Sequence, residues 1–327
     1  MNPSVQSLCE SLAAGRSLLK NTFRLENDML YPVCANLFCV RGVTPDAARL
    51  LACRDLIRAN TGFFSCFRGN ARLPLICLLS LEKDPDERLQ RVITAYELLK
   101  KRFFSSDFLA LAAYFISDMD EEGTAGAAER ARGLYERMRK EHPLLTGSED
   151  SVFCVLLARM DRDDSLLIAD MEESYALLKD HFRDSNSMQT VSHSLATDPR
   201  TPKEKVGRLT DLYEELVRRG IRYGRWRELS VLSSLALADG SIPSLADELC
   251  DADEALSREK GWQGILGFNR RTRAMHAAML SADLHAPTNP NEQTSVTGAL
   301  AGVIAEEMAV FAAVTAASAA AAASSNT

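Results

Sequence analysis

Four short segments at regular spacing decide the fold: AYELLKKR at 95–102, LYERMRKE at 134–141, SYALLKDH at 174–181 and LYEELVRR at 212–219. Their tyrosines, Tyr96, Tyr135, Tyr175 and Tyr213, follow one another at intervals of 39, 40 and 38 residues. Apolar residues recur seven and four positions before each tyrosine and three positions after it. This spacing forms one stripe along an α-helix, so it predicts a helix with one buried face in each unit.

A second apolar segment follows each of these helices. The four copies are DFLALAAYFISD (107–118), DSVFCVLLARMD (150–161), MQTVSHSLATD (188–198) and ELSVLSSLALAD (228–239), and each ends at an aspartate. The unit is therefore a helix, a short loop, a second helix and an acidic stop. Self-similarity at this period is typical of stacked helical hairpins.

Weaker copies flank the four units. Downstream, Ala246, Leu249 and Leu256 fit the apolar stripe with Asp253 in place of the tyrosine, and RAMHAAMLSAD (273–283) follows. Upstream, Ala47, Leu50 and Ile57 fit it with Arg54 in that place, followed by RLPLICLLSLEKD (72–84). Residues 5–40 read as one more hairpin. Terminal units of a stack are often atypical, because one of their faces meets no neighbour.

We therefore predict an all-α fold of six to seven stacked helical hairpins, α-solenoid-like, with a period of about 39 residues. The hairpin domain spans residues 1–286, a linker covers 287–297, and an alanine-rich helix and tail occupy 298–327. Helix starts are expected where a capping side chain precedes a proline, at Thr44-Pro45, Asp84-Pro85 and Thr201-Pro202. The competing hypothesis is an irregular helical domain whose helices have similar lengths.

Composition narrows the class of protein further. Eight cysteines are present, none in a CxxC pair and most inside apolar runs, so we expect reduced, buried thiols and no metal or other cofactor. The first residues lack the charged start and apolar core of a signal peptide, which predicts a cytoplasmic location. A net charge of −7 argues against general nucleic-acid binding by the whole chain.

Two segments resemble a bacterial family known as domain of unknown function 4003. They are KEHPLLTGSEDSVFCVLLA (140–158) and RRGIRYGRWRELSVLSSLALAD (218–239), and the alanine-rich end of the chain fits the same family. The resemblance covers nearly the whole chain and implies a bacterial, cytoplasmic protein. It brings no activity and no catalytic residue.

The candidate binding site is a set of arginines interleaved with aromatic residues, in the turns of two successive hairpins. Its members are Arg218, Arg219, Arg222, Tyr223, Arg225, Trp226 and Arg227 in the first turn, and Arg270, Arg271 and Arg273 in the second. Equivalent turns of a stack lie on one edge, so these residues are expected to form a positive ridge. Arginine beside aromatic rings suits carboxylate or phosphate groups. The alternative is that the arginines only complement a helix C-terminus and stay solvated.

Other polar groups give weaker signals. The acidic runs 117–123 and 161–173 contain potential ligands for a divalent cation, but their positions between hairpins favour helix capping. The five histidines show neither HExxH spacing nor a readable pairing with a cysteine, so no catalytic residue is assigned.

The alanine-rich tail is expected to be helical, but Glu306 and Glu307 interrupt it and leave too few apolar residues for a membrane span. We expect it to pack through small residues against the hairpins or against another subunit, which would make a homo-oligomer. A frayed tail and membrane attachment stay open as alternatives.

Two function classes follow. The first is a binding or scaffold module that uses the arginine ridge to bind an acidic protein, a peptide or a phosphorylated ligand. The second is an enzyme with its active site in the groove of the helical array, with an unknown reaction. Whether the protein is an enzyme is left open by the sequence.

Overall fold

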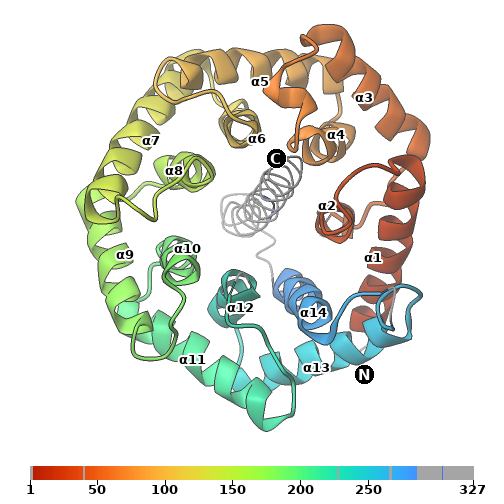
Figure 1. The fold of residues 1–327 in the computed structure, drawn as a ribbon, viewed down its shortest axis with the longest axis vertical. Helices are drawn as coiled ribbons and strands as arrows, with labels where there is room; N and C mark the ends of the chain where they lie inside the picture. The colour runs from red at the N-terminus through yellow and green to blue at the C-terminus, as the bar shows by residue number, and fades with distance from the viewer. Residues whose placement is uncertain (1–2, 40, 227, 265–266, 286–303, 305–327) are drawn as a thin grey trace, which may run out of the picture.

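The protein is a ring of helical hairpins, seen in a computed structural model that describes residues 3–39, 41–226, 228–264, 267–285 and 304 (Figure 1). In these residues there are fourteen α-helices, one short 3-10 helix and no strand, so the all-α prediction is confirmed. The predicted linker 287–297 and tail 298–327 lie outside the described residues, except for Ile304, which is fully buried.

The odd-numbered helices form the outer layer of the ring. They are α1 (Pro3–Thr22), α3 (Ala47–Asn60), α5 (Pro85–Lys100), α7 (Glu121–Glu141), α9 (Asp164–Leu178), α11 (Pro202–Arg218) and α13 (Ile242–Arg258). Each buries one apolar face and exposes polar residues on the other, as the predicted stripe requires. In α5, for example, Leu89, Val92, Tyr96 and Leu99 are all buried.

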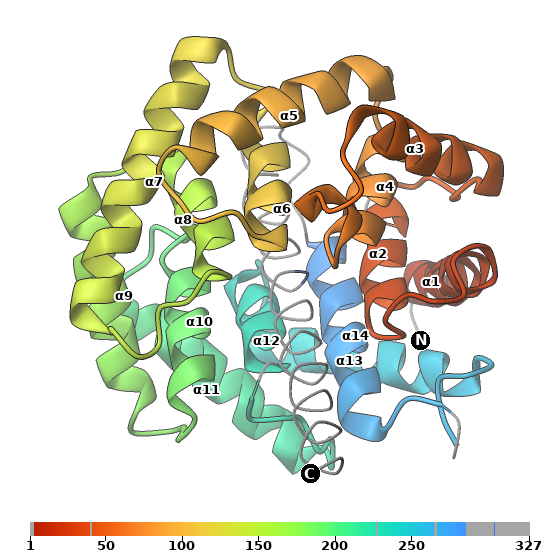
Figure 2. The ribbon, with the colours of Figure 1, turned by 45° about the horizontal axis from the view of Figure 1, so that its top comes forward.

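The even-numbered helices form the inner layer. They are α2 (Leu30–Cys39), α4 (Arg72–Ser80), α6 (Asp107–Ile116), α8 (Asp150–Ala158), α10 (Ser185–Leu195), α12 (Glu228–Leu237) and α14 (Arg270–Leu284). Helices α2, α6 and α8 are buried along almost their whole length, which explains why their sequences are mostly apolar. Figure 2 shows the inner helices along the axis of the ring, with the outer helices oblique to them.

Aromatic contacts join successive hairpins. The rings of Tyr96, Tyr135 and Tyr213 meet phenylalanines of the preceding hairpin's turn edge-on, with centroids 5.1–5.5 Å apart. Tyr175 instead meets the ring of His142 in a tilted arrangement, with the ring centroids 4.6 Å apart. The phenylalanine partners are Phe67, Phe103 and Phe182. The four tyrosines that decide the fold are therefore points of contact between neighbouring hairpins.

The stack closes on itself, a feature that an open solenoid lacks. Helix α13 packs against α1, and α14 packs against both α1 and α2. The buried guanidinium of Arg16 on α1 lies 4.6 Å from the ring centre of Phe268, in the turn before α14. Gly261, at φ +84, leaves room for that guanidinium, because a Cβ there would lie 2.8 Å from Arg16.

Helix starts match the predicted caps at two of the three sites. Asp84 and Thr201 cap α5 and α11, each with a proline in the first helical position, and Glu204 completes a capping box. At the third site the prediction was wrong. The side chain of Asp46, not that of Thr44, accepts from the backbone of Arg49, and α3 begins after Pro45.

Candidate interaction surface

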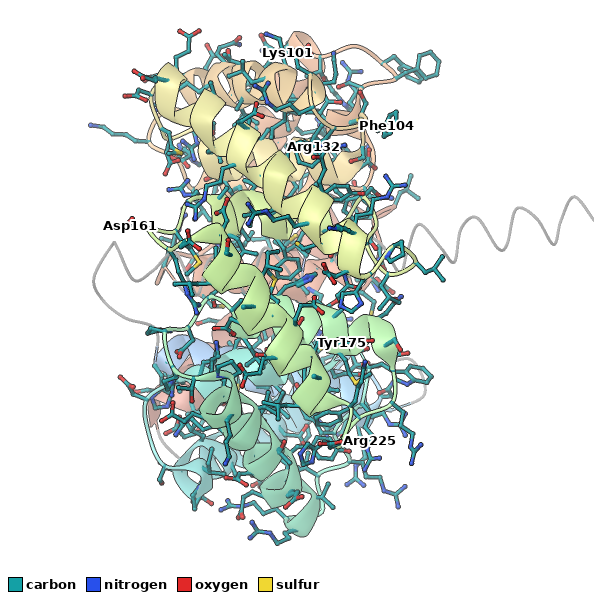
Figure 3. The ribbon with its side chains drawn as sticks, turned by 90° about the vertical axis from the view of Figure 1, so that its left-hand side faces the viewer. Lys101, Phe104, Arg132, Asp161, Tyr175 and Arg225 are labelled. Carbon is teal, nitrogen blue, oxygen red and sulfur yellow. The ribbon has the colours of Figure 1, made fainter. Side chains whose placement is uncertain are left out.

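All the turns within hairpins lie on one rim of the ring, which we call the turn rim. It consists of residues 23–29, 61–71, 101–106, 142–149, 179–184, 219–226 and 259–269, without 265–266. The connections between hairpins form the opposite rim, the junction rim. Figure 3 shows Phe104 and Arg225 at the turn rim and Asp161 at the junction rim. Arg219, Arg222 and Arg225 belong to these seven turns of the described chain. Arg218, Arg270, Arg271 and Arg273 lie on the helix ends beside them, which we count with the turn rim.

Backbone hydrogen bonds fix the conformation of the turn that begins at the end of α11. The N–H of Gly220 donates to the carbonyl of Val217 at 3.0 Å, and the N–H of Ile221 donates to that of Leu216 at 2.9 Å. This pair of bonds is a Schellman motif, and it requires the left-handed backbone of Gly220, at φ +79. The chain that follows is therefore directed outwards from a rigid helix end.

Four side chains of this turn are exposed: Arg218, Arg222, Arg225 and Trp226. Arg218 forms an ion pair with Glu215. Arg225 donates from Nε to the Tyr213 hydroxyl at 2.8 Å and lies over that ring, which orients its guanidinium. Trp226 is 67% exposed. Arginine and tryptophan are thus presented together at the rim.

Two candidates in this turn serve the fold instead. Tyr223 is buried and donates its hydroxyl proton to the carbonyl of Glu228 at 2.9 Å, and burial raises its pKa. Arg219 hydrogen-bonds Glu215 and Asp247, which raises the pKa of Arg219 and ties α11 to α13. Arg227 lies outside the described residues.

The second predicted cluster divides in the same manner. Arg270 and Arg271 are exposed at the start of α14. Arg273 is buried, and its Nε and Nη2 bind the two carboxylate oxygens of Asp253 at 2.8 and 3.0 Å. Within the described chain, Arg222, Arg270 and Arg271 make no ion pair, so these three are available to a partner.

The sequence prediction missed a set of exposed apolar side chains on the turn rim, which we call the apolar tips. They come from the turns of five hairpins and are 67–97% exposed: Leu25, Phe63, Phe64, Phe104, Leu144 and Trp226. Only Trp226 was among the candidates. A signal was present, since Phe63-Phe64 and Arg225-Trp226 place large apolar residues between the two helices of a predicted hairpin. These six side chains lie on the same rim as the exposed Arg222 and Arg225.

The basic turn and one of the junctions carry opposite charge. The turn at 218–228 holds five arginines against one acidic residue, whereas the junction at 117–122 holds four acidic residues and no basic one. The acidic residues cap the outer helices, as Asp120 does by accepting from the N–H of Gly123. The acidic runs are therefore used in capping, and no group of metal-binding side chains occurs among the described residues.

Arginines of the outer helices in turn cover the last carbonyls of the inner helices at the junction rim. Arg130 donates to the carbonyl of Ala158 at 3.1 Å and binds Asp164 at 2.7 Å, and Arg208 donates to that of Ala236 at 2.7 Å. Arg130 and Arg208 are thus engaged inside the protein, unlike Arg222, Arg270 and Arg271 at the turn rim.

A small pocket opens at the turn rim between the turns of two hairpins. It encloses about 50 Å³ and is lined by Phe103, Phe104, Arg132, Tyr135 and Arg139 among others. Pockets for small-molecule substrates usually measure about 300–1,000 Å³, so this hollow is too small for one. It can admit a short side chain or an anionic group beside Arg139.

One pair of titratable groups lies inside the ring. Nδ1 of His193 on α10 lies 3.4 Å from Oδ1 of Asp150 on α8, and both side chains are buried. The other Asp150 oxygen accepts from the backbone N–H of Gly147 at 2.8 Å, and Phe153 packs against the imidazole. These contacts hold the turn before α8 and join α8 to α10, which is a structural use of the pair.

Comparison of the sequence with known proteins identifies the family of this chain. The family profile described as "Protein of unknown function (DUF4003)" matches residues 17–309. The chain belongs to this family. It is 25% identical over 261 residues to the uncharacterized protein YeaA of Bacillus subtilis (strain 168), covering 76% of this chain and 77% of YeaA. No solved structure matches the chain significantly.

Proposed function

We propose that the protein is a helical-repeat binding module, located in the cytoplasm, that uses its turn rim to bind a partner carrying anionic groups. Acidic proteins or peptides and phosphorylated ligands present such groups. The observation that carries the proposal is the exposure of Arg222, Arg270 and Arg271, without an ion pair in the described chain, on a rim remote from the acidic junctions. Arginine binds carboxylate and phosphate in a planar, two-pronged geometry that suits this use.

Free thiols support the cytoplasmic location. None of the eight cysteines forms a disulfide bond in the structure, and six of them are buried. Thiols of this kind are the rule in reducing compartments. None of the described helices is long and apolar enough to cross a bilayer.

The proposal is tested by the binding of a fluorescein-labelled oligoglutamate peptide and a phosphoserine peptide, followed by fluorescence anisotropy at low and high salt. The native chain is expected to bind at least one of them, with affinity falling as salt screens the charges. The variant Arg222→Ala/Arg225→Ala/Arg270→Ala/Arg271→Ala is expected to lose about tenfold or more.

A matched variant removes the same charge elsewhere. Arg41, Lys83, Arg137 and Lys203 are exposed and lie away from the turn rim, so their joint replacement by alanine should leave binding within about twofold. Equal losses in the two variants would mean that net charge alone attracts the peptides. Such a result would overturn the proposal.

A further inference from the structure

The apolar tips and the exposed cations alternate along the turn rim. Leu25 follows the exposed Arg24, Phe104 lies three residues after Lys101, and Leu144 lies four residues after Lys140. Trp226 follows Arg225 directly, and Arg270 and Arg271 stand on the next hairpin. The exposed acidic side chains on or beside this rim are fewer: Asp28, Glu141 and Asp180. Of these, Asp28 is already bound by Lys20 at 2.7 Å.

The tips project from separate turns and do not form one continuous patch. A protein partner would need a socket for each tip, because the apolar centre of a protein interface is closely packed. A lipid headgroup layer is fluid, so it can accommodate an apolar side chain at any position without a preformed socket. Phenylalanine, leucine and tryptophan side chains insert into it favourably. The turns that carry the tips lie on one rim of a closed ring, and a planar surface can meet such a rim at several points at once. Figure 3 shows this rim from the side, with Phe104 and Arg225 on it.

We propose that the turn rim binds the surface of an anionic lipid bilayer, with the apolar tips inserted among the headgroups and the arginines and lysines on lipid phosphates. This inference rests on the proposed function and names the partner of the same surface. Charge complementarity argues for it, since basic side chains beside inserted apolar residues are the combination that holds peripheral proteins on anionic membranes. The acidic junction rim then points away from the negative surface.

The protein contains its own reporter of this contact. Of its two tryptophans, Trp226 is 67% exposed on the turn rim and Trp262 is fully buried at the ring closure. Vesicles of phosphatidylcholine with phosphatidylglycerol should shift the emission of Trp226 to shorter wavelength and shield it from iodide. Vesicles of phosphatidylcholine alone should do so weakly. Trp226→Phe should abolish the change while leaving the emission of Trp262.

Flotation with the same vesicles tests the other tips. The full-length variant Phe63→Ser/Phe64→Ser/Phe104→Ser keeps every arginine. It is expected to bind the vesicles at least about tenfold more weakly than the native chain. Leu166→Ser on α9 is the control, because Leu166 is 60% exposed but lies away from the turn rim. It should float like the native chain. Circular dichroism of each variant confirms that it is folded.

The outcomes separate the two proposals. Binding of oligoglutamate or phosphoserine peptide without binding of phosphatidylglycerol vesicles overturns the membrane inference and leaves the proposed function standing. Absence of binding to all these probes overturns both. Flotation that is unaffected by the serine substitutions overturns the insertion of the tips.

Discussion

Lys205 on α11 places its Nζ 2.7 Å from both carboxylate oxygens of Asp170 on α9, and both side chains are buried. Asp170 stands five residues before Tyr175, where the neighbouring hairpins have Arg130 and Arg208. Those arginines bind the last carbonyls of their inner helices. Here Lys205 and Arg162 bind Asp170 and donate to the carbonyls of Asp198 and Ala196 instead. In this hairpin, Lys205 and Arg162, both bound to Asp170, thus make the carbonyl contacts that a single arginine makes in the neighbouring hairpins.

Asp170→Ala should cost about 3–5 kcal/mol of unfolding free energy, because it leaves the buried ammonium group of Lys205 without its counter-ion. Burial already lowers the pKa of Lys205, and Asp170 opposes that shift. Lys205→Met should cost less, since Arg162 still neutralises the carboxylate. Urea unfolding measures both. Lys203→Met, exposed on the same helix, should stay within about 0.5 kcal/mol. An Asp170→Ala effect as small as that control would contradict the account.

The contact between Phe182 and Tyr213 should be measurable as a coupling energy. Their ring centroids are 5.5 Å apart and the rings are perpendicular. A double-mutant cycle with Phe182→Leu and Tyr213→Leu should give a coupling of about 0.5–1.5 kcal/mol. Phe182→Leu combined with Tyr96→Leu, two hairpins away, serves as the additive reference. A coupling no larger than in that reference would show that the tyrosine acts only by filling space.

The cysteines should differ sharply in reactivity. Cys66 and Cys250 are half-buried, whereas the other six are buried, and burial raises the pKa of Cys9 to about 12. A thiol-specific disulfide reagent should therefore modify Cys66 and Cys250 first under native conditions, because the thiolate is the reactive form. All eight should react in urea. Mass spectrometry identifies the labelled positions, and early labelling of Cys9, Cys77 or Cys154 would be incompatible with the described core.

The pairing of Asp118 with Arg159 predicts a pH-dependent loss of stability. Burial by itself would raise the pKa of Asp118, but the hydrogen bonds and charge of Arg159 outweigh it and hold that pKa below its ordinary value. Such a carboxylate stabilises the fold above the ordinary pKa, and the contribution disappears as pH falls through the depressed value. The destabilisation by Arg159→Gln should therefore be larger near neutral pH than at about pH 2.

Arg137→Gln provides the comparison for that experiment. Arg137 is exposed and donates to the Ser165 hydroxyl, and it forms no ion pair among the described residues. Its effect in urea unfolding should be similar at the two pH values. If the Arg159→Gln effect is also the same at both, the carboxylate of Asp118 contributes nothing through this pair.

Much of the architecture could be predicted because it depends on local patterns. A stripe such as Leu89, Val92 and Tyr96 predicts an amphipathic helix wherever it occurs, since the spacing alone puts these residues on one face. Caps such as Thr201 with Glu204 act within one helical turn. The basic turn could be found for the same reason, because five arginines lie within ten residues of sequence.

Which of those arginines are exposed could not be predicted. Arg219 and Arg273 find carboxylates on Asp247 and Asp253, partners that lie 28 and 20 residues away in sequence. Tyr223 is buried although its neighbours Arg222 and Arg225 are exposed. Whether each of these side chains is exposed or buried depends on how each hairpin packs on the next.

By itself, the sequence determined the helical hairpins, their order and the basic turn, because periodicity, capping and composition act over short stretches of chain. Only the tertiary structure decided that the stack closes, with Arg16 beside Phe268, and that the apolar tips of five hairpins share one rim. Both depend on small rotations between successive hairpins that add up around the ring, and no local pattern records their sum.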